Sequence, residues 1–380
     1  MDTNINTPAD LAATSDIDES AVVGMDKKAT PSDNVDLLKV TDLKMYFNTP
    51  DGIVKAVDGV SFTLNLGETL GIVGESGCGK SVTSMTLMGL VPMPPGEIHG
   101  GDILFKGQSL LSLPEKDVQK IRGNNIAMIF QDPLSSLNPV YRVGKQVGEG
   151  LMIHKGYKKK EALARAIELL DLVGIPNAAE RARDYPHQFS GGMRQRAMIA
   201  MALVCDPELL IADEPTTALD VTIQAQILEL MQSIQKRTNS AIIMITHDLG
   251  VVADMANRIL VMYAGKPVEY GTTDEIFYRP LHPYTWGLMR SIPKRTVGVD
   301  EPLTPIKGNP TSLIDLPPGC AFAPRCPYVR PQCSEEHPPL VEVDGAHSSS
   351  CFFSADPEFL MNSPVYDKTD SAEDKGGQDG

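Results

Sequence analysis

The 380-residue sequence has no long hydrophobic run, and its longest uninterrupted apolar stretch is the nine-residue segment from Ala197 to Cys205. A helix that crosses a bilayer needs about 18 to 20 apolar residues. We therefore expect no segment of this sequence to span a membrane. The start of the sequence is acidic and rich in Ser, Thr and Asp, and does not resemble a secretory signal.

Basic residues are also scarce, with 34 Lys and Arg against 49 Asp and Glu, which gives a net charge of −15. Residues 1–36 carry eight acids and two bases, and residues 355–380 carry seven acids and two bases. We expect both segments to be disordered acidic tails. An acidic body without a basic stripe argues against nucleic acid as the main partner.

Cysteine is sparse as well, and four of the six cysteines gather near the C-terminus. They are Cys320, Cys326, Cys333 and Cys351. Without a secretory signal we expect reduced thiols and a cytosolic compartment, where four thiolates would suit zinc or an iron–sulfur cluster. The two-residue loops of zinc ribbons are missing, so we expect an iron–sulfur cluster of the 4Fe-4S type, with Zn²⁺ or free thiols as alternatives.

The most informative segment, residues 74–81, places two glycines before Lys80 and Ser81 with four residues between the glycines. It follows a predicted strand at residues 69–73 and precedes a predicted helix at residues 81–90. Glycines let successive N–H groups point at one anion, and the helix N-terminus adds partial positive charge. This predicts a nucleotide phosphate site in which Lys80 contacts the β- and γ-phosphates and the Ser81 hydroxyl ligates Mg²⁺.

Three further predicted buried strands end in polar residues. They are residues 126–130 before Gln131, residues 209–212 before Asp213 and Glu214, and residues 241–246 before His247. Ligands bind at the carboxyl edge of parallel sheets, so we expect these side chains to lie near the nucleotide. We expect Gln131 to contact the metal or its water, Asp213 to hold the metal through water, and Glu214 to polarise the attacking water.

Two other regions complete the predicted architecture. Residues 37–66 alternate apolar and polar side chains around a turn, which predicts antiparallel strands. Within them, Phe47 would stack on an adenine ring or be an ordinary half-buried strand residue. A helix-rich stretch follows at residues 140–188. Ser190 is then a good N-cap for a long helix that begins with Gly191 and Gly192, which is either a second anion site or an ordinary cap.

In this order and at these separations, the motifs resemble the nucleotide-binding subunit of ATP-binding-cassette (ABC) transporters. The resemblance covers roughly residues 37–275. It implies an α/β P-loop NTPase fold of the ABC cassette type, in which a mixed core sheet joins an antiparallel β subdomain and a helical subdomain at about residues 132–190. It also implies an ATPase that uses ATP and Mg²⁺.

The resemblance further implies a role for each motif. Glu214 would be the catalytic base and His247 would contact the γ-phosphate, while Gln131 would link the metal site to membrane subunits. Two subunits would meet head to tail, so that the signature segment that begins at Ser190 contacts ATP held by the partner, although Met193 stands where that signature usually has Gln. The implied ATP-binding residues are Phe47, Gly74, Glu75, Ser76, Gly77, Cys78, Gly79, Lys80, Ser81, Val82, Gln131, Asp213, Ser190, Gly191 and Gly192.

The region after the cassette narrows the resemblance. The segment from His282 to Thr285, together with the Cys-containing extension at residues 276–354, resembles the D-type ATP-binding subunit of oligopeptide and dipeptide permeases. This implies ATP-driven peptide import at the cytoplasmic face of a bacterial inner membrane. The implied partners are a second ATPase subunit of the F type, two membrane permease subunits and, indirectly, an extracytoplasmic peptide-binding protein. The alternatives are import of nickel or another small solute, and a soluble ABC ATPase that acts on nucleic acid or the ribosome.

Overall fold

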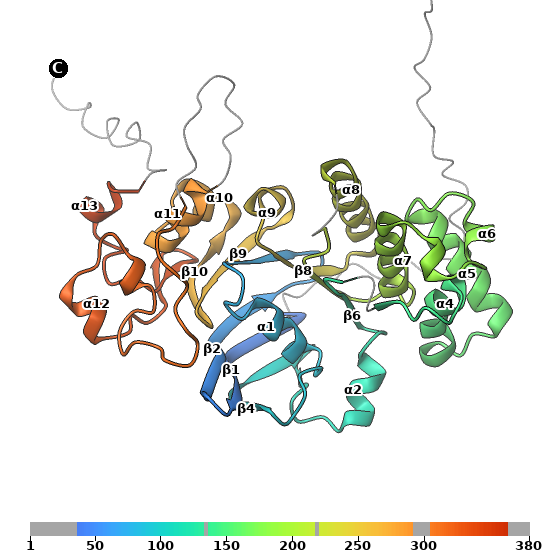
Figure 1. Ribbon diagram of the computed structural model, residues 1–380, viewed down its shortest axis with the longest axis horizontal. Coiled ribbons are helices and arrows are strands. Elements are labelled where there is room, and N and C mark those ends of the chain that lie inside the picture. The colour runs from blue at the N-terminus through green and yellow to red at the C-terminus, as the bar shows by residue number, and fades with distance from the viewer. Residues whose placement is uncertain (1–35, 133–135, 217–219, 292–304, 364–380) are drawn as a thin grey trace, which may run out of the picture. The chain divides into compact units, whose positions relative to one another are not determined.

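A computed structural model describes residues 36–132, 136–216, 220–291 and 305–363 of the chain. The described residues form two sheets with helices packed against them (Figure 1). Most of both predicted acidic tails, residues 1–35 and 364–380, lies outside the described residues.

The smaller sheet is antiparallel and has the strand order β2-β1-β4-β5. Its strands are β1 (Leu38–Thr49), β2 (Gly52–Leu64), β4 (Gly96–Phe105) and β5 (Gln108–Ser109). A tight turn joins β1 to β2, with Thr49 paired to Gly52. This confirms the antiparallel strands that the alternating pattern predicted.

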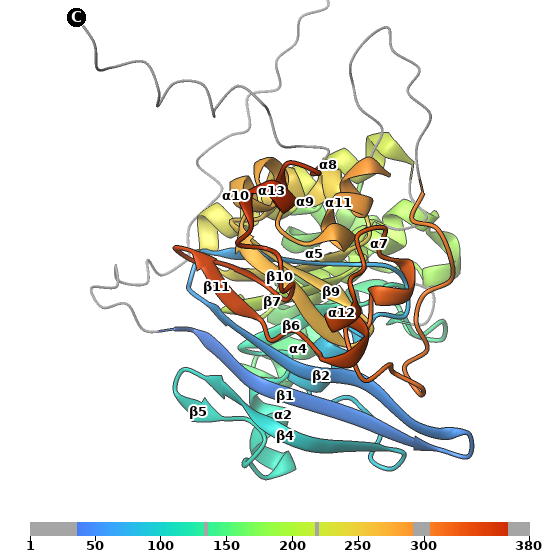
Figure 2. The same ribbon diagram turned by 90° about the vertical axis from the view of Figure 1, so that its left-hand side faces the viewer.

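The larger sheet has the order β11-β12-β10-β9-β3-β8-β7-β6. Its strands are β3 (Thr69–Val73), β6 (Ile126–Ile129), β7 (Leu209–Asp213), β8 (Ala241–Thr246), β9 (Arg258–Tyr263), β10 (Lys266–Thr272), β11 (Val341–Asp344) and β12 (His347–Ser349). The pairings from β9 to β6 are parallel, and those from β9 to β11 are antiparallel. Figure 2 shows this sheet above the antiparallel one. The sheet is therefore mixed, as predicted, and its parallel part includes the predicted strands with polar ends.

Helices cover the sheets and form a separate group after β6. The α-helices are α1 (Lys80–Leu87), α2 (Glu115–Ile121), α4 (Val143–His154), α5 (Lys159–Leu172), α6 (Ala178–Arg181), α7 (Gly191–Leu203), α8 (Val221–Thr238), α9 (Leu249–Met255), α10 (Thr273–Tyr278), α11 (Pro283–Arg290), α12 (Pro331–Glu335) and α13 (Pro357–Leu360). The described residues also include the short 3₁₀ helices η2 (Pro186–Gln188) and η3 (Ala323–Arg325). Helices α4 to α6 lie within the predicted helix-rich stretch at residues 140–188, and α7 is the long helix predicted to follow Ser190.

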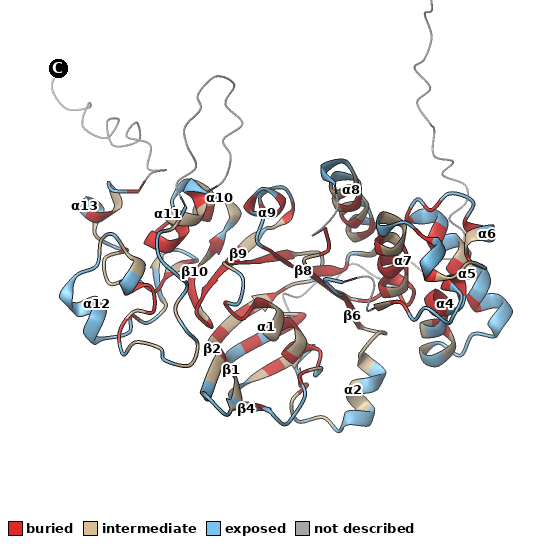
Figure 3. Cartoon of the chain, viewed as in Figure 1, coloured by how far each residue is buried: buried red, intermediate tan, exposed pale blue. Residues whose placement is uncertain are grey.

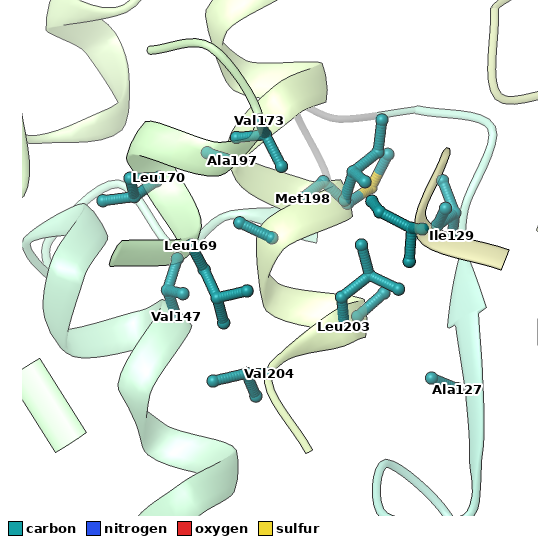
Figure 4. Packing of buried hydrophobic residues seen from close by; sticks show 14 of the residues in the cluster. Ala127, Ile129, Val147, Leu169, Leu170, Val173, Ala197, Met198, Leu203 and Val204 are labelled. Atoms are coloured by element: carbon teal, nitrogen blue, oxygen red, sulfur yellow. The ribbon is translucent and has the colours of Figure 1, made fainter. Parts of the chain in front are cut away.

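Two core clusters lie on opposite faces of the larger sheet, because its parallel strands β3, β6, β7 and β8 are buried along their whole length (Figure 3). On β7, Leu209 and Ile211 face the cluster shared with the antiparallel sheet and α1, whereas Leu210 and Ala212 face the cluster shared with the helices. In the second cluster, Met198 of α7 lies close to Ile129 of β6 (Figure 4). This packing fixes the strand ends relative to α1 and α7.

The C-terminal region forms a third core cluster and extends the main sheet. Strand β12 pairs with β10, and Phe322 and Tyr284 pack against strand β9. Residues 355–363, predicted to belong to a disordered tail, contain α13, whose Phe359 is buried against Trp286 with ring centroids 5.2 Å apart. That prediction was wrong for these residues, because burial of an aromatic side chain offsets the cost of ordering the segment.

The prediction of an iron–sulfur cluster was also wrong. Cys320, Cys326, Cys333 and Cys351 line one small cavity, but in the described part of the chain no group of Cys, His, Asp or Glu is arranged to hold a metal ion. The same finding gives no support to zinc. The cavity is otherwise lined mainly by aromatic and proline side chains, and burial raises the pKa of Cys326 to about 11 and of Cys351 to about 12. These two thiols are therefore protonated at neutral pH, and all six cysteines are free.

Candidate nucleotide site

A glycine-rich loop connects β3 to α1. Gly79 has a φ of 103°, and a Cβ atom there would lie 2.1 Å from the carbonyl oxygen of Ala56. Gly74 has a φ of 152°, and a Cβ atom there would lie 2.2 Å from the carbonyl oxygen of Met262. These glycines are required because side chains rarely adopt such φ values and because neighbouring backbone fills the space. The loop therefore leads directly into the N-terminus of α1, as an anion site requires.

Lys80 is the first residue of α1 and is 5% exposed. Its Nζ atom donates hydrogen bonds to the carbonyl oxygens of Gly74, at 2.8 Å, and Glu75, at 3.0 Å. Two other loop residues, Ser76 and Gly77, are exposed, whereas Cys78 is buried. The Lys80 side chain is thus buried against the loop, whereas the tip of the loop is exposed. This arrangement suits a ligand that brings negative charge to the lysine.

Ser81 and Asp213 bring α1 and β7 together. The Ser81 hydroxyl donates to the Asp213 carboxylate at 3.1 Å, and Asp213 is 4% exposed. Burial raises the pKa of the Asp213 carboxyl, and the Glu214 charge acts in the same direction, whereas the Ser81 hydrogen bond and the charge of Lys80 oppose them. A positive ligand at this point would offset the cost of burying the carboxylate.

Three strand ends converge on Glu214. The amide of Gln131, after β6, donates to Glu214 at 3.0 Å, and Nδ1 of His247, after β8, lies 3.4 Å from the same carboxylate. Glu214 has a φ of 47°, and its N–H donates to the carbonyl oxygen of Ile245. Left-handed backbone is uncommon in non-glycine residues and recurs at functional sites. The convergence predicted from the polar strand ends is confirmed.

Three side chains of this site offer oxygen atoms that suit magnesium. The hydroxyl of Ser81, the carboxylate of Asp213 and the side-chain amide oxygen of Gln131 are hard oxygen donors, which Mg²⁺ prefers. A Mg²⁺ ion typically keeps several waters and takes only one or two protein ligands. The donor set therefore fits the ion that the sequence predicted.

The remaining predicted residues lie elsewhere. Phe47 on β1 is half-buried and packs against the core cluster of the antiparallel sheet, while Val82 packs on that cluster from α1. Ser190 caps α7, because its hydroxyl accepts from the N–H of Met193 at 3.3 Å. Within the described residues no hydrogen bond joins Ser190, Gly191 or Gly192 to the glycine-rich loop. The roles predicted for them in binding ATP remain predictions.

Two residues that sequence reasoning did not place in the site contact the loop. The guanidinium of Arg325 pairs with the carboxylate of Glu75, at 2.6 and 3.0 Å, and the hydroxyl of Tyr284 accepts from the N–H of Glu75 at 2.7 Å. The hydrogen bonds to Glu75 raise the pKa of Arg325 above its ordinary value. Arg325 lies 250 residues from its partner, so no local pattern could have revealed the contact.

The glycine-rich loop, the buried Asp213 beside Ser81 and the polar strand ends around Glu214 define a nucleotide-binding cassette of the P-loop class. Comparison with protein families agrees. A family model described as "ABC transporter" matches residues 57–217. A second, described as "Oligopeptide/dipeptide transporter, C-terminal region", matches residues 268–333.

Known proteins resemble most of the chain. An oligopeptide transport ATP-binding protein, OppD of Bacillus subtilis (strain 168), is 57% identical over 311 residues, which cover 82% of this chain and 87% of the relative. The dipeptide transport ATP-binding protein DppD of the same organism is 54% identical, with 83% and 94% covered. OppD of Escherichia coli (strain K12) is 53% identical, with 83% and 93% covered. The chain therefore belongs to the oligopeptide and dipeptide transport ATP-binding proteins of the ABC transporter family.

Solved structures share the cassette fold. The dimeric, post-hydrolysis structure of the ATP-binding cassette MJ0796 bound to ADP and Pi matches with a TM-score of 0.57 and 25% identity, over 62% of this chain and 98% of that one. The structure of cbiO1 from Clostridium perfringens, part of the ABC transporter complex cbiONQ, matches with a TM-score of 0.55 and 29% identity, over 65% and 92%. The predicted ABC cassette fold is thus confirmed.

Proposed function

We propose that this chain is the ATP-hydrolysing subunit that powers import of oligopeptides or dipeptides through a membrane ABC transporter. The main observation behind the proposal is that the side chains of Gln131 and His247 both contact Glu214, beside a glycine-rich loop suited to phosphate. The relatives named above are peptide transport proteins, which favours peptides over nickel and over a soluble ATPase acting on nucleic acid or the ribosome.

Each side chain has a task in ATP hydrolysis. Lys80 leaves the loop carbonyls and binds the β- and γ-phosphates, where its charge stabilises the negative charge of the transition state. Glu214, whose carboxylate is held in place by the side-chain amide of Gln131, accepts a proton from the attacking water. His247 contacts the γ-phosphate. Ser81, Asp213 and Gln131 would hold Mg²⁺, which when bound neutralises charge on the phosphate oxygens.

A second cassette completes the site. Ser190, Gly191 and Gly192 lie at the start of α7, where Ser190 and Gly191 are exposed and free N–H groups are available for a phosphate held by the partner. The MJ0796 cassette was solved as a dimer. We infer a heterodimer with a second ATPase subunit of the F type, in which Phe47 stacks on the adenine of the nucleotide bound by its own loop.

Membrane subunits are the remaining partners. Among the described residues no helix is long and apolar enough to cross a bilayer. Large apolar side chains are exposed around α4, namely Val140 (69%), Tyr141 (46%), Ile153 (69%) and Tyr157 (45%). We infer that this region, within a cassette at residues 37–275, docks on two permease subunits at the cytoplasmic face of a bacterial inner membrane. A peptide-binding protein outside the membrane would deliver the substrate.

Co-purification and ATP hydrolysis test the proposal. The chain is expressed with its genomic neighbours and extracted from membranes, and hydrolysis is measured with and without peptides and the peptide-binding protein. We expect membrane subunits to co-purify and peptides to stimulate hydrolysis, and a complex with Glu214→Gln to assemble but show no stimulation. Hydrolysis that nickel stimulates and peptides do not would contradict peptide import. A chain that extracts alone and hydrolyses ATP would contradict the transporter assignment.

A further inference from the structure

The contact between Arg325 and Glu75 joins the C-terminal region to the phosphate loop. Arg325 lies in η3, and its side chain is 4% exposed. All five of its N–H groups donate: to the Glu75 carboxylate at 2.6 and 3.0 Å, to the Tyr263 hydroxyl at 3.3 Å, and to the carbonyls of Ile306 and Lys307 at 3.3 and 3.1 Å. Only arginine can make this set, because lysine has a single nitrogen.

The arginine itself is rigidly held. Phe322, three residues earlier, packs on Tyr263 with ring centroids 5.3 Å apart and on Tyr284 at 5.4 Å. Both tyrosines are buried, at 1% and 0% exposure. A guanidinium fixed by its carbonyl acceptors and by this aromatic cluster has little freedom left to lose when it binds a carboxylate.

Glu75 joins Arg325 to the phosphate loop. Its carboxylate binds Arg325, its N–H donates to the Tyr284 hydroxyl, and its carbonyl accepts from Nζ of Lys80 at 3.0 Å. Three groups of Glu75 thus form hydrogen bonds, and two of these groups bond to the C-terminal region. The next two residues of this loop, Ser76 and Gly77, are exposed.

We propose that Arg325 is a positioning residue for ATP: by holding Glu75, it keeps the phosphate loop in the conformation that receives the β- and γ-phosphates. This inference rests on the proposed ATPase function and gives the C-terminal region a task in it. Without the contact, the loop samples other conformations, and the apparent Kd for ATP rises in inverse proportion to the competent fraction. If that fraction falls to about a tenth, the Kd rises about tenfold.

Binding of a fluorescent ATP analogue, methylanthraniloyl-ATP with Mg²⁺, to the full chain tests the proposal. We expect Arg325→Met to raise the Kd about tenfold and Arg325→Lys to raise it less, because charge remains while the paired geometry is lost. Arg279→Met is the matched control, since Arg279 forms an exposed ion pair with Asp344 in the same region, and should bind like the wild type. A Kd for Arg325→Met within twofold of the wild type would overturn the proposal.

Further measurements separate positioning from a structural role. Loss of folded protein lowers the number of binding sites in a titration and leaves the Kd of the remaining sites unchanged, whereas positioning changes the Kd. In the assembled complex the KM for ATP should rise while kcat stays within about threefold. A double variant with Glu75→Gln should bind no more weakly than the weaker single variant, because both changes break one contact. Effects that multiply, or a fall in kcat alone, would refute the proposal.

The wild-type result separates the positioning role of Arg325 from the proposed ATPase function. A wild-type chain that binds and hydrolyses ATP, together with an Arg325→Met variant that does so equally well, contradicts the positioning role alone. A wild-type chain that binds no nucleotide contradicts the proposed function and the positioning role together.

Discussion

Glu269 on β10 is a fully buried carboxylate, with 0% exposure, where the C-terminal region joins the main sheet. It accepts hydrogen bonds from the N–H groups of Leu281 and His282 at 2.7 and 3.0 Å. It also accepts from the Thr285 hydroxyl at 2.5 Å and from Nε2 of His347 on β12 at 2.8 Å. Glu269→Ala would leave four donors without this acceptor in a site that water does not reach.

The cost of this change follows from the number of donors. A buried donor without a partner costs about 1 to 3 kcal/mol. At about 1 kcal/mol for each of the four donors, the cost is about 4 kcal/mol. This agrees with the ~3 to 5 kcal/mol of stability that is lost when one partner of a buried ion pair is removed. For a protein of ordinary stability this is a large share of the ~5 to 15 kcal/mol that favours folding. We expect the Tm to fall by at least about 5 °C.

Thermal unfolding of the full chain measures the effect. Glu269→Gln should fall between wild type and Glu269→Ala, because an amide keeps the shape but offers one acceptor oxygen. The matched control is Glu342→Ala, which removes an exposed acid from β11, the edge strand of the same sheet, and should melt like the wild type. If Glu269→Ala melts within about 1 °C of the control, the buried network does not hold the C-terminal region to the sheet.

Three other predictions concern pH, the loop and catalysis. Burial lowers the pKa of His282 to about 3, so between about pH 6.5 and pH 5 only the unfolded chain binds a proton at this residue, and the free energy of unfolding falls by about 2 kcal/mol. Denaturant midpoints at pH 7 and pH 5 should therefore show a smaller loss of stability for His282→Asn than for the wild type, and equal losses would contradict this. Gly79→Ala should lower the Tm more than Gly77→Ala, since a Cβ at Gly77 meets nothing within 4 Å; the reverse order would count against the close approach of Ala56. Glu214→Gln should reduce turnover by on the order of 10²-fold while the Kd for ATP is unchanged, and near-normal hydrolysis would refute its assignment as the base.

Local pattern was sufficient to predict the strands and the glycine-rich loop that form the candidate nucleotide site. The strand at residues 69–73 was predicted with the bounds that the structure shows, because a short apolar run before a glycine-rich loop leaves little freedom in its placement. The meeting of Gln131 and His247 at Glu214 could also be predicted. Parallel strands place their carboxyl ends at one edge of a sheet, so residues far apart in sequence share a site.

The C-terminal region could not be predicted in the same way. Strand β12 is three residues long and joins β10 across almost eighty residues of sequence, too short a segment to carry a periodic signal. The spacing of Cys320, Cys326, Cys333 and Cys351 suggested metal ligation, yet spacing does not fix where thiols point. The fold surrounds them with aromatic side chains instead. The contact of Arg325 with Glu75 depends entirely on this tertiary packing.

Uptake of a labelled peptide tests the central claim most directly. The complex of this chain with its second ATPase and its membrane subunits is reconstituted in vesicles, with ATP on the side of the ATPase subunits and the peptide and its binding protein on the other. The account predicts uptake that requires ATP and is lost with Glu214→Gln, although that complex still binds ATP. Peptide uptake at the same rate without ATP, or with Glu214→Gln in place of the wild type, would contradict it.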